Sequence, residues 1–274
     1  MPPFTKICYS KEKLWNKNID IKNLPLCESW NNIFQILFSD KRINILQNKI
    51  NKYILEQNSK LLYPKPNYLF KAFNMCPFDE IKVVFIGQDP YFNKEIYKEN
   101  IVPQAYGLSF SVPINFEIPS SLKNIYINLK KYNHIKNIPT HGCLDYWAYQ
   151  GCLMMNSALT VVDGQKNCHS NEWKWFTNRI IEEISTRCNK VIFVLWGGEA
   201  YKKIEFINLN KHHTIISSHP SGLSANKKFK SYPAFLNQDH FGLINSHLTH
   251  PIDWSLPEYS FDISNDDLNK DLNK

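Results

Sequence analysis

Short apolar runs recur along this chain, and each ends at a glycine, a proline or a polar residue. Val83–Ile86 precedes Gly87, and another apolar run precedes Asn156. Residues 191–196 precede Gly197-Gly198, and residues 213–218 precede His219-Pro220. Runs of this length and composition predict buried strands of a parallel sheet. Because parallel strands place their carboxyl ends on one edge, we expect Asp89, Asn156, Gly197 and His219 to converge there.

Apolar residues at helical spacing predict helices around these strands, within residues 28–60, 120–132, the start of 145–155, and 171–187. The alternation of strands and helices predicts an α/β fold. We expect a single three-layer domain with a short, mostly parallel central sheet of about four strands flanked by helices. Finer expectations are an N-cap at Ser120 or Ser121 after Pro119, a long loop over 93–106, and a short strand-like segment at 107–112.

The length of 274 residues suits one sizeable core, and the 43% apolar and 21% charged shares are ordinary for a globular protein. We expect an N-terminal tail or extension at 1–25, a folded domain at 26–258 and a polar C-terminal tail at 259–274. No apolar stretch reaches membrane-span length, and the N-terminus lacks the apolar region of a secretion signal. An intracellular protein is expected; nucleus, mitochondrion, cytoplasm and viral factory are not distinguished.

The seven cysteines are an odd number and form no CxxC pair, which argues against a zinc ribbon, an iron–sulfur site and a disulfide framework. Their use fits a reducing compartment. The nine histidines show no HExxH pattern. We therefore expect neither a metal nor a cofactor.

The net charge of +7 permits a polyanionic partner without requiring one. Basic residues gather in the sequence around Gly197-Gly198 and residues 218–224. They are Lys202, Lys203, Lys211, His212, His213, Lys227, Lys228 and Lys230. This set predicts a phosphate-binding face, and an ordinary solvated face is the alternative.

The segment Val83–Tyr91 places an amide, a carboxylate, a rigid ring and a phenol directly after a predicted strand, as Gln88, Asp89, Pro90 and Tyr91. Proline restricts its own φ and pushes the preceding residue toward extended backbone. The Asp89 carboxylate is therefore aimed by a stiff backbone. An ordinary strand-to-turn junction is the alternative.

The sequence GQDPY at 87–91 resembles the water-activating loop of uracil-DNA glycosylases of the uracil-N-glycosylase type. Four more segments match in the family's order: GLSF (107–110), PSSL (119–122), LMMNSALTV (153–161) and SHPSGLS (218–224). The resemblance covers about residues 26–256. It implies a monomeric, metal-independent enzyme that flips uracil out of single- or double-stranded DNA, hydrolyses its N-glycosidic bond and leaves an abasic site for base excision repair. It also implies a DNA-mimicking inhibitor protein as a second partner.

The resemblance assigns bond cleavage to Asp89 and His219. Breaking an N-glycosidic bond develops positive charge on the sugar and negative charge on the base. A carboxylate can stabilise the sugar cation and hold a water, and a donor to uracil O2 can stabilise the base anion. Glycoside hydrolases usually pair two carboxylates, but a carboxylate–histidine pair suits a leaving group that departs as a weakly basic anion. A turn histidine before proline is the alternative for His219.

Base selection is assigned to four residues. Asn156 carries a donor and an acceptor for the N3–O4 edge of uracil, and cytosine presents the reversed pattern there. Phe110 supplies a stacking face, Tyr91 fills the space of the thymine methyl, and Gln88 presents backbone groups. The alternatives are a strand-end amide that caps its own backbone for Asn156 and a core aromatic for Phe110.

DNA contacts are assigned to small-residue loops, whose backbone N–H groups can approach phosphates closely. Leu223 is the wedge that enters the duplex after the uracil leaves. The full set is Pro90, Pro119, Ser120, Ser121, Gly197, Gly198, Pro220, Ser221, Gly222, Leu223 and Ser224.

The chain departs from the family pattern near these loops. Phe92 stands where a histidine is usual, Gly198 replaces a serine, and Gly222 replaces a proline. The loops at about 93–102 and 225–232 are longer than usual. We expect the lysines of the second loop, Lys227, Lys228 and Lys230, to supply phosphate contacts that offset the missing ones.

Three other functions compete with this interpretation. One is a non-catalytic DNA-binding or replication-accessory module with the same fold, although a binder has no need of Asp89, Asn156 and His219 together. Another is a glycosylase of the same superfamily with a different preferred base. The third is an unrelated nucleotide or phosphate-ester hydrolase, but the sequence has no Walker loop, metal cluster or GxSxG elbow.

Overall fold

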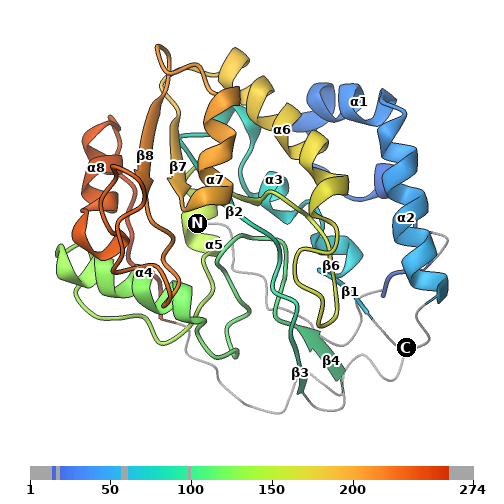
Figure 1. Ribbon diagram of the computed structural model, residues 1–274, viewed down its shortest axis with the longest axis horizontal. Helices are drawn as coiled ribbons and strands as arrows, with labels where there is room; N and C mark the ends of the chain where they lie inside the picture. The colour runs from blue at the N-terminus through green and yellow to red at the C-terminus, as the bar shows by residue number, and fades with distance from the viewer. Residues whose placement is uncertain (1–13, 17–18, 57–60, 98–99, 259–274) are drawn as a thin grey trace, which may run out of the picture.

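A four-stranded parallel sheet lies at the centre of the computed structural model, which describes residues 14–16, 19–56, 61–97 and 100–258. Its strand order is β5-β2-β7-β8 (Figure 1). The strands are β2 (Val83–Gly87), β5 (Cys152–Asn156), β7 (Ile192–Trp196) and β8 (His213–Ser217). The predicted short parallel sheet of four strands is confirmed.

The register of the strands brings their carboxyl ends to one edge. Gly87 pairs with Asn156, and Trp196 pairs with Ser217. All residues of β2, β5 and β7 are buried, as expected for strands covered on both faces. The polar segments that follow β2, β7 and β8 therefore start side by side.

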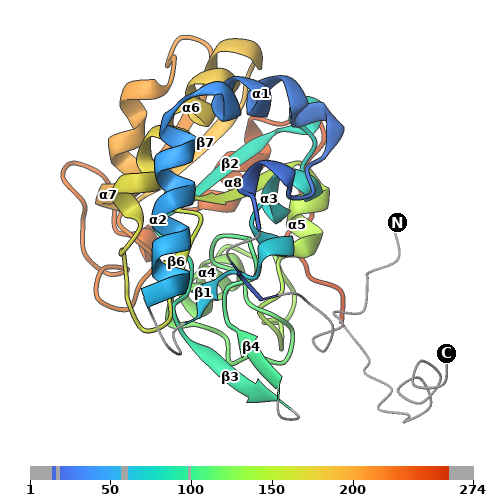
Figure 2. The same cartoon turned by 90° about the vertical axis from the view of Figure 1, so that its right-hand side faces the viewer.

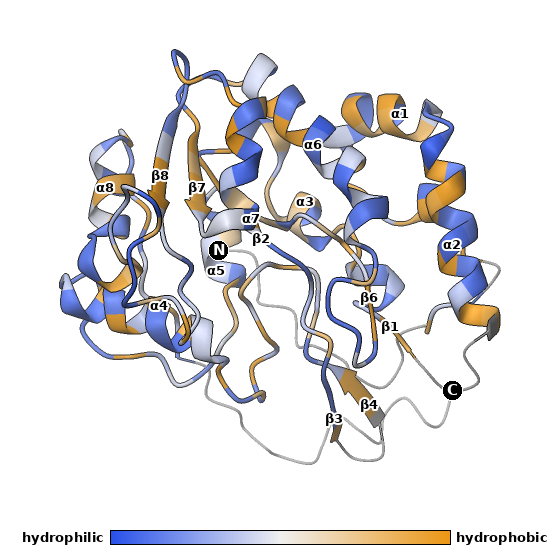
Figure 3. Cartoon of the chain, in the orientation of Figure 1, coloured by the Kyte–Doolittle hydropathy of each residue, from blue (hydrophilic) through white to orange (hydrophobic). Residues whose placement is uncertain are grey.

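Helices cover both faces of the sheet. They are α1 (Asn31–Ser39), α2 (Arg42–Glu56), α3 (Lys71–Met75), α4 (Ser120–Lys131), α5 (Asp145–Tyr149), α6 (Ser170–Arg187), α7 (Gly198–Tyr201) and α8 (His240–Ser246). In Figure 2, β2 and β7 lie between α6 and α7 on one side and α3 and α5 on the other. Figure 3 shows apolar and polar bands alternating along α6, whereas most of β7 is apolar. Amphipathic helices on a two-sided apolar sheet give the predicted three-layer arrangement.

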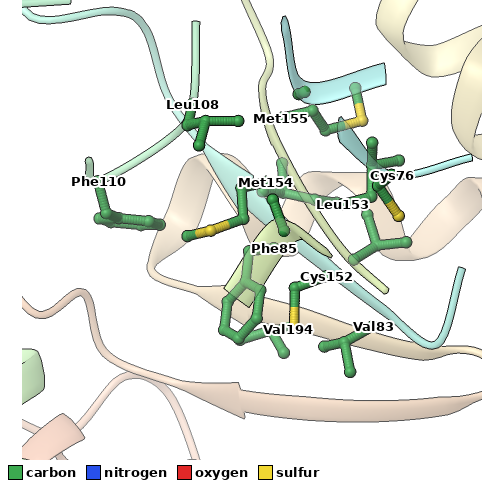
Figure 4. Close-up of a cluster of buried hydrophobic side chains, with 14 of the residues drawn as sticks. Cys76, Val83, Phe85, Leu108, Phe110, Cys152, Leu153, Met154, Met155 and Val194 are labelled. Atoms are coloured by element: carbon green, nitrogen blue, oxygen red, sulfur yellow. The ribbon is translucent and has the colours of Figure 1, made fainter. Parts of the chain in front are cut away.

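Aromatic side chains pack against one another both among the helical segments and on the sheet. Trp30 contacts Phe73 edge-on at a centroid distance of 4.9 Å, and Phe34 contacts Phe176 of α6 at 5.5 Å. On the sheet, Phe85 meets the ring of Trp196 at 5.4 Å. Figure 4 shows Phe85 near Met154 and Val194, with Phe110 at the side of this cluster. The edge-on geometry is the favoured one for packed rings.

Two small antiparallel sheets lie outside the central one. β1 (Leu62–Tyr63) pairs with β6 (Val161–Val162), and β3 (Lys94–Tyr97) pairs with β4 (Asn100–Pro103). The expectation of a loop over 93–106 is therefore wrong across the hairpin, where Ile96 pairs with Ile101. β-Branched residues on both arms favour this pairing, and the intervening polar residues obscured it in the sequence. The hairpin lies at the bottom of Figure 1.

Two finer expectations are wrong. Residues 107–112 form turns instead of a strand, because Phe110 has a φ of 63°. The N-cap of α4 is Pro119, so Ser120 and Ser121 lie inside its first turn. Residues 19–25 belong to the predicted N-terminal tail or extension; among them Ile21 is fully buried, and Gln47 of α2 accepts its backbone N–H at 2.8 Å.

Of the predicted tails, residues 1–13, 17–18 and 259–274 lie outside the described part of the chain. Among the helices of that part, none is both long and apolar enough to span a membrane.

Candidate active site

A cavity of about 220 Å³ opens at the carboxyl edge of the sheet. It is smaller than the ~300–1,000 Å³ typical of sites for drug-sized ligands, so it suits a single small ring. The predicted catalytic and base-binding residues all line it: Gln88, Asp89, Tyr91, Phe110, Asn156 and His219. Pro90, Ser121 and Ser221 from the predicted DNA-binding set line it too. Gly197 does not line the cavity but packs against His219.

Asp89 follows β2 in a turn that is tied to the next strand. The backbone N–H of Ala158 donates to the Gln88 carbonyl at 3.0 Å, and the N–H of Ser157 donates to the Gly87 carbonyl at 2.9 Å. The Gln88 carbonyl oxygen therefore already accepts one hydrogen bond, and its second lone pair can accept another. These bonds hold the start of the Asp89 turn against the end of β5.

The Asp89 carboxylate accepts a hydrogen bond from the backbone N–H of Asn167 at 2.7 Å. With its nitrogen turned toward the carboxylate, the Asn167 side chain also donates to Asp89 Oδ2 at 3.2 Å and accepts from Gln88 Nε2. Burial raises the pKa of Asp89, and the Asn167 N–H and the Lys166 ammonium both oppose this shift. The donors therefore favour the ionised carboxylate in a partly dry site.

His219 follows β8, and its ring has a defined hydrogen-bonding direction. Its Nδ1 lies 3.0 Å from the backbone nitrogen of Ser221, which can only donate. Nδ1 is therefore the acceptor, and in the neutral ring the proton sits on Nε2. Burial, with a smaller effect from Lys166, lowers the pKa of His219 from 6.5 to about 4. At neutral pH the ring is uncharged and presents one N–H donor.

Gly197 makes room for His219 between β7 and β8. Its φ is 85°, and a Cβ at this position would lie 2.8 Å from the His219 Cβ. Residues other than glycine rarely adopt this backbone conformation. Gly197 thus allows the close approach of the histidine to the sheet edge.

Asn156 ends β5 with a side chain that points at no backbone partner. The residue is 9% exposed, and its amide makes no hydrogen bond with any residue in the described ranges. A Cβ on the neighbouring Gly87 would collide with the Asn156 amide. The geometry thus favours an amide free to pair with a ligand over one that caps its own strand.

Phe110 and Tyr91 form the apolar wall of the cavity. Phe110 is buried with a φ of 63°, an uncommon conformation for an aromatic residue. The Tyr91 hydroxyl donates to the Phe110 carbonyl at 3.3 Å, and the Phe110 ring packs edge-on against Trp196 at 5.6 Å. Burial raises the pKa of Tyr91, so its hydroxyl stays protonated. These contacts hold both rings in place.

The loop after His219 carries an exposed leucine at its tip. Leu223 is 83% exposed, and the backbone N–H groups of Ser224 and Ala225 both donate to the Ser221 carbonyl at 2.9 Å. Asn124 of α4 donates to the Pro220 carbonyl at 2.7 Å. The first two bonds close the loop on itself, and the Asn124 bond ties it to α4.

The longer loop at 225–232 folds back over α7. Phe229 and Tyr232 are paired through their backbones, and the Phe229 ring contacts Tyr201 at 5.5 Å. Phe229 also lies 3.8 Å from the Cβ position that Gly198 lacks. The Lys230 ammonium lies 3.9 Å from the Tyr201 ring centroid. Lys227, Lys228 and Lys230 are all exposed.

Three of the basic residues that were predicted to form one phosphate-binding face bond elsewhere in the structure. Lys203 and His212 are buried, and they bond to Asn178 Oδ1 at 2.5 Å and the Ser185 carbonyl at 2.8 Å respectively. Lys211 donates to the Thr186 carbonyl at 2.6 Å. These residues are close to the site in sequence, but their side chains bond to α6, so this part of the prediction is wrong.

Sequence reasoning missed Lys166 and Asn167, which come from the loop between β6 and α6. Lys166 lines the cavity, and Asn167 holds Asp89. Asn167 has a φ of 61°, which asparagine tolerates better than most residues. The sequence carried no signal for either residue, because no strand was predicted directly before them.

Comparison with known proteins adds an independent finding. Residues 73–249 match the family model described as the Uracil DNA glycosylase superfamily. The chain is 39% identical over 253 residues to the probable uracil-DNA glycosylase of Acanthamoeba polyphaga mimivirus, covering 87% of this chain and 67% of that protein. It is 40% identical over 233 residues to the uracil-DNA glycosylase of Buchnera aphidicola subsp. Acyrthosiphon pisum (strain APS), covering 83% and 98%.

Solved structures agree with the sequence relatives. The crystal structure of mimivirus uracil-DNA glycosylase matches with a TM-score of 0.84 at 37% identity, over 90% of this chain and 95% of that chain. A variant of mimivirus UNG in complex with UGI matches with a TM-score of 0.82 at 38% identity, over 88% and 92%.

Proposed function

Because this chain belongs to the uracil-DNA glycosylase superfamily, we propose that it hydrolyses the N-glycosidic bond of uracil in DNA at the Asp89–His219 cavity. The observation that carries the assignment is that Asp89, Asn156 and His219, from three separate strand ends, line one cavity sized for a single ring. The products are free uracil and an abasic site, so the enzyme acts in base excision repair.

Recognition of the base follows from the cavity walls. The flipped uracil stacks on Phe110, and the unpartnered Asn156 amide pairs with its N3–H and O4. Cytosine would face the amide with donors and acceptors reversed, and a buried mismatch of this kind is costly. Tyr91, held by its bond to the Phe110 carbonyl, occupies the space that a thymine methyl would need.

The charges of the bond-breaking step match two groups of the site. As the C1′–N1 bond breaks, the electron pair stays on uracil, and the Nε2–H of neutral His219 donates to O2 of the resulting anion. The Asp89 carboxylate stabilises the cationic sugar and orients a water. The water oxygen then bonds to C1′, and its proton passes to Asp89. The Asn167 N–H holds the carboxylate in place.

The rim of the cavity supports contact with DNA. Ser121 in the first turn of α4 and Ser221 in the loop with Leu223 line the cavity, and Leu223 is exposed enough to enter a duplex. Gly197 packs against His219 beside them. Lys227 and Lys228 are exposed in the segment that follows Leu223 and add positive charge there, whereas Lys230 already lies over Tyr201. UGI binds the related mimivirus UNG variant, and we expect a DNA-mimicking inhibitor to bind the same rim here.

A cleavage assay in EDTA tests this function. Single-stranded oligonucleotides would carry one uracil, thymine or cytosine at the same position. Release of uracil alone is the expected result. Retained DNA binding without release of any base would instead favour the accessory-module function, and release of another base would favour the different-specificity alternative.

A further inference from the structure

The loop at 163–169 is tied to the catalytic turn at two points. The backbone N–H of Gly164 donates to the Phe92 carbonyl at 3.0 Å, and that of Asn167 donates to Asp89 Oδ2 at 2.7 Å. Lys166 lies between these two anchors. Its backbone is therefore held at the rim of the cavity although its side chain is exposed.

The Lys166 ammonium has no partner within the described residues, which sets it apart from its neighbour Lys94. Lys94 is paired with Asp163 at 2.5 Å. Lys166 forms no ion pair or hydrogen bond in that part of the chain, yet it lines the cavity. Its charge lowers the pKa of both Asp89 and His219. A positive charge with no ion-pair partner in the described residues therefore lies at the cavity.

A positive charge at this place poses a problem for the reaction. The sugar becomes cationic in the transition state, and a nearby positive charge would raise the energy of that state. A phosphate bound to the ammonium removes this conflict. A base that fills the cavity necessarily brings its own flanking phosphates to the rim, and lysine binds phosphate as a point charge.

We propose that Lys166 binds one of the two DNA phosphates that flank the flipped uridine. This inference rests on the proposed function and adds a substrate contact to it. Lys166 is a binding residue, and the bond-breaking roles remain with Asp89 and His219. Its substitution leaves both backbone anchors of the loop in place, because they use the N–H groups of Gly164 and Asn167.

The test compares Lys166→Ala and Lys166→Arg with wild type on a single-stranded uracil oligonucleotide. Lys41→Ala is the matched control, since Lys41 is an exposed lysine between α1 and α2 that does not line the cavity. We expect Lys166→Ala to raise KM about threefold to tenfold, with kcat within about twofold of wild type. The slope of log binding constant against log salt should fall by about 0.7, the share of one single-strand phosphate. Lys166→Arg should restore KM.

A second arm identifies the phosphate. Oligonucleotides would carry a neutral methylphosphonate at the linkage 5′ or 3′ to the uridine. On one of these two substrates, Lys166→Ala and wild type should differ by less than twofold, because the contact is already lost.

Two results would overturn the inference while wild type still releases uracil. One is a KM and salt slope for Lys166→Ala equal to those of Lys41→Ala. The other is a fall in kcat at unchanged KM, which would place Lys166 in the chemical step. Absence of uracil release by wild type would instead refute the proposed function.

Discussion

The Ser221 backbone N–H donates to His219 Nδ1 at 3.0 Å. This bond places the ring proton on Nε2, and burial keeps the ring neutral with a pKa of about 4. A neutral donor suits an anionic leaving group, because no proton has to be transferred for uracil to leave. The site therefore stabilises charge at the base oxygen and does not rely on an acid.

The pH dependence of kcat/KM should show a single acid limb. Asp89 must be ionised, and burial raises its pKa above 3.8; His219 must be neutral, and its pKa is about 4. Protonation of either group disables the site, so activity should be lost as pH falls through these values and stay level from about pH 6 to 8. Initial rates between pH 4 and 8 would check this. A rate that rises as pH falls from 7 to 5 would point to a cationic His219 as general acid.

Gly197→Ala should impair both folding and catalysis. The new Cβ would meet the His219 Cβ at 2.8 Å on a backbone with a φ of 85°. We expect a loss of about 1–3 kcal/mol in the free energy of unfolding and a clear fall in kcat. Gly222→Ala is the control for the unfolding measurement, because its Cβ would meet no atom within 4 Å. Denaturant unfolding would be measured on both variants and uracil release on Gly197→Ala and wild type; equal stability of the two variants would contradict the packing argument.

Tyr91→Ala should admit thymine. Removing the ring opens the wall that faces C5 of the base, so thymine release should become measurable while uracil release declines. Tyr91→Phe keeps the wall and loses only the hydroxyl bond to the Phe110 carbonyl, so it should keep the wild-type preference. Release of both bases from matched oligonucleotides gives the answer. If Tyr91→Ala still rejects thymine completely, the filter lies elsewhere.

Replacing Lys227, Lys228 and Lys230 together with alanine should flatten the salt dependence of DNA binding. Each lost phosphate contact lowers the slope by about 0.7 on single strands and about 0.9 on duplexes. Lys230 already lies over Tyr201, so most of the change should come from Lys227 and Lys228. Titrations at several salt concentrations, with Lys230→Ala alone beside the triple variant, separate these contributions. An unchanged slope in the triple variant would exclude these lysines as phosphate contacts.

The central arrangement could be predicted from the sequence because it depends on local patterns. The runs before Gly87, Asn156, Gly197 and His219 are short and apolar, and parallel pairing then brings their ends to one edge. The β3–β4 hairpin escaped prediction because Ile96 and Ile101 are too few to show a strand period.

The positions of the basic residues and of the loop after β6 depend on tertiary contacts, which no local sequence pattern predicts. Part of the basic cluster was a feature of sequence proximity only, because Lys203 and His212 bond to α6. Lys166 and Asn167 reach the cavity only because the loop after β6 bonds to Asp89 and Phe92. Neither residue belongs to a motif that could have marked it.

The most direct test of the account is single-turnover uracil release by Asp89→Asn and His219→Leu, with DNA binding measured on the same samples. Both variants should bind the oligonucleotide and fold like wild type. The rate should fall by about 10²–10⁴-fold for Asp89→Asn, and by about 10²–10³-fold for His219→Leu, which removes one donor to the developing anion. A rate within tenfold of wild type in either variant, with binding retained, would contradict the assigned roles.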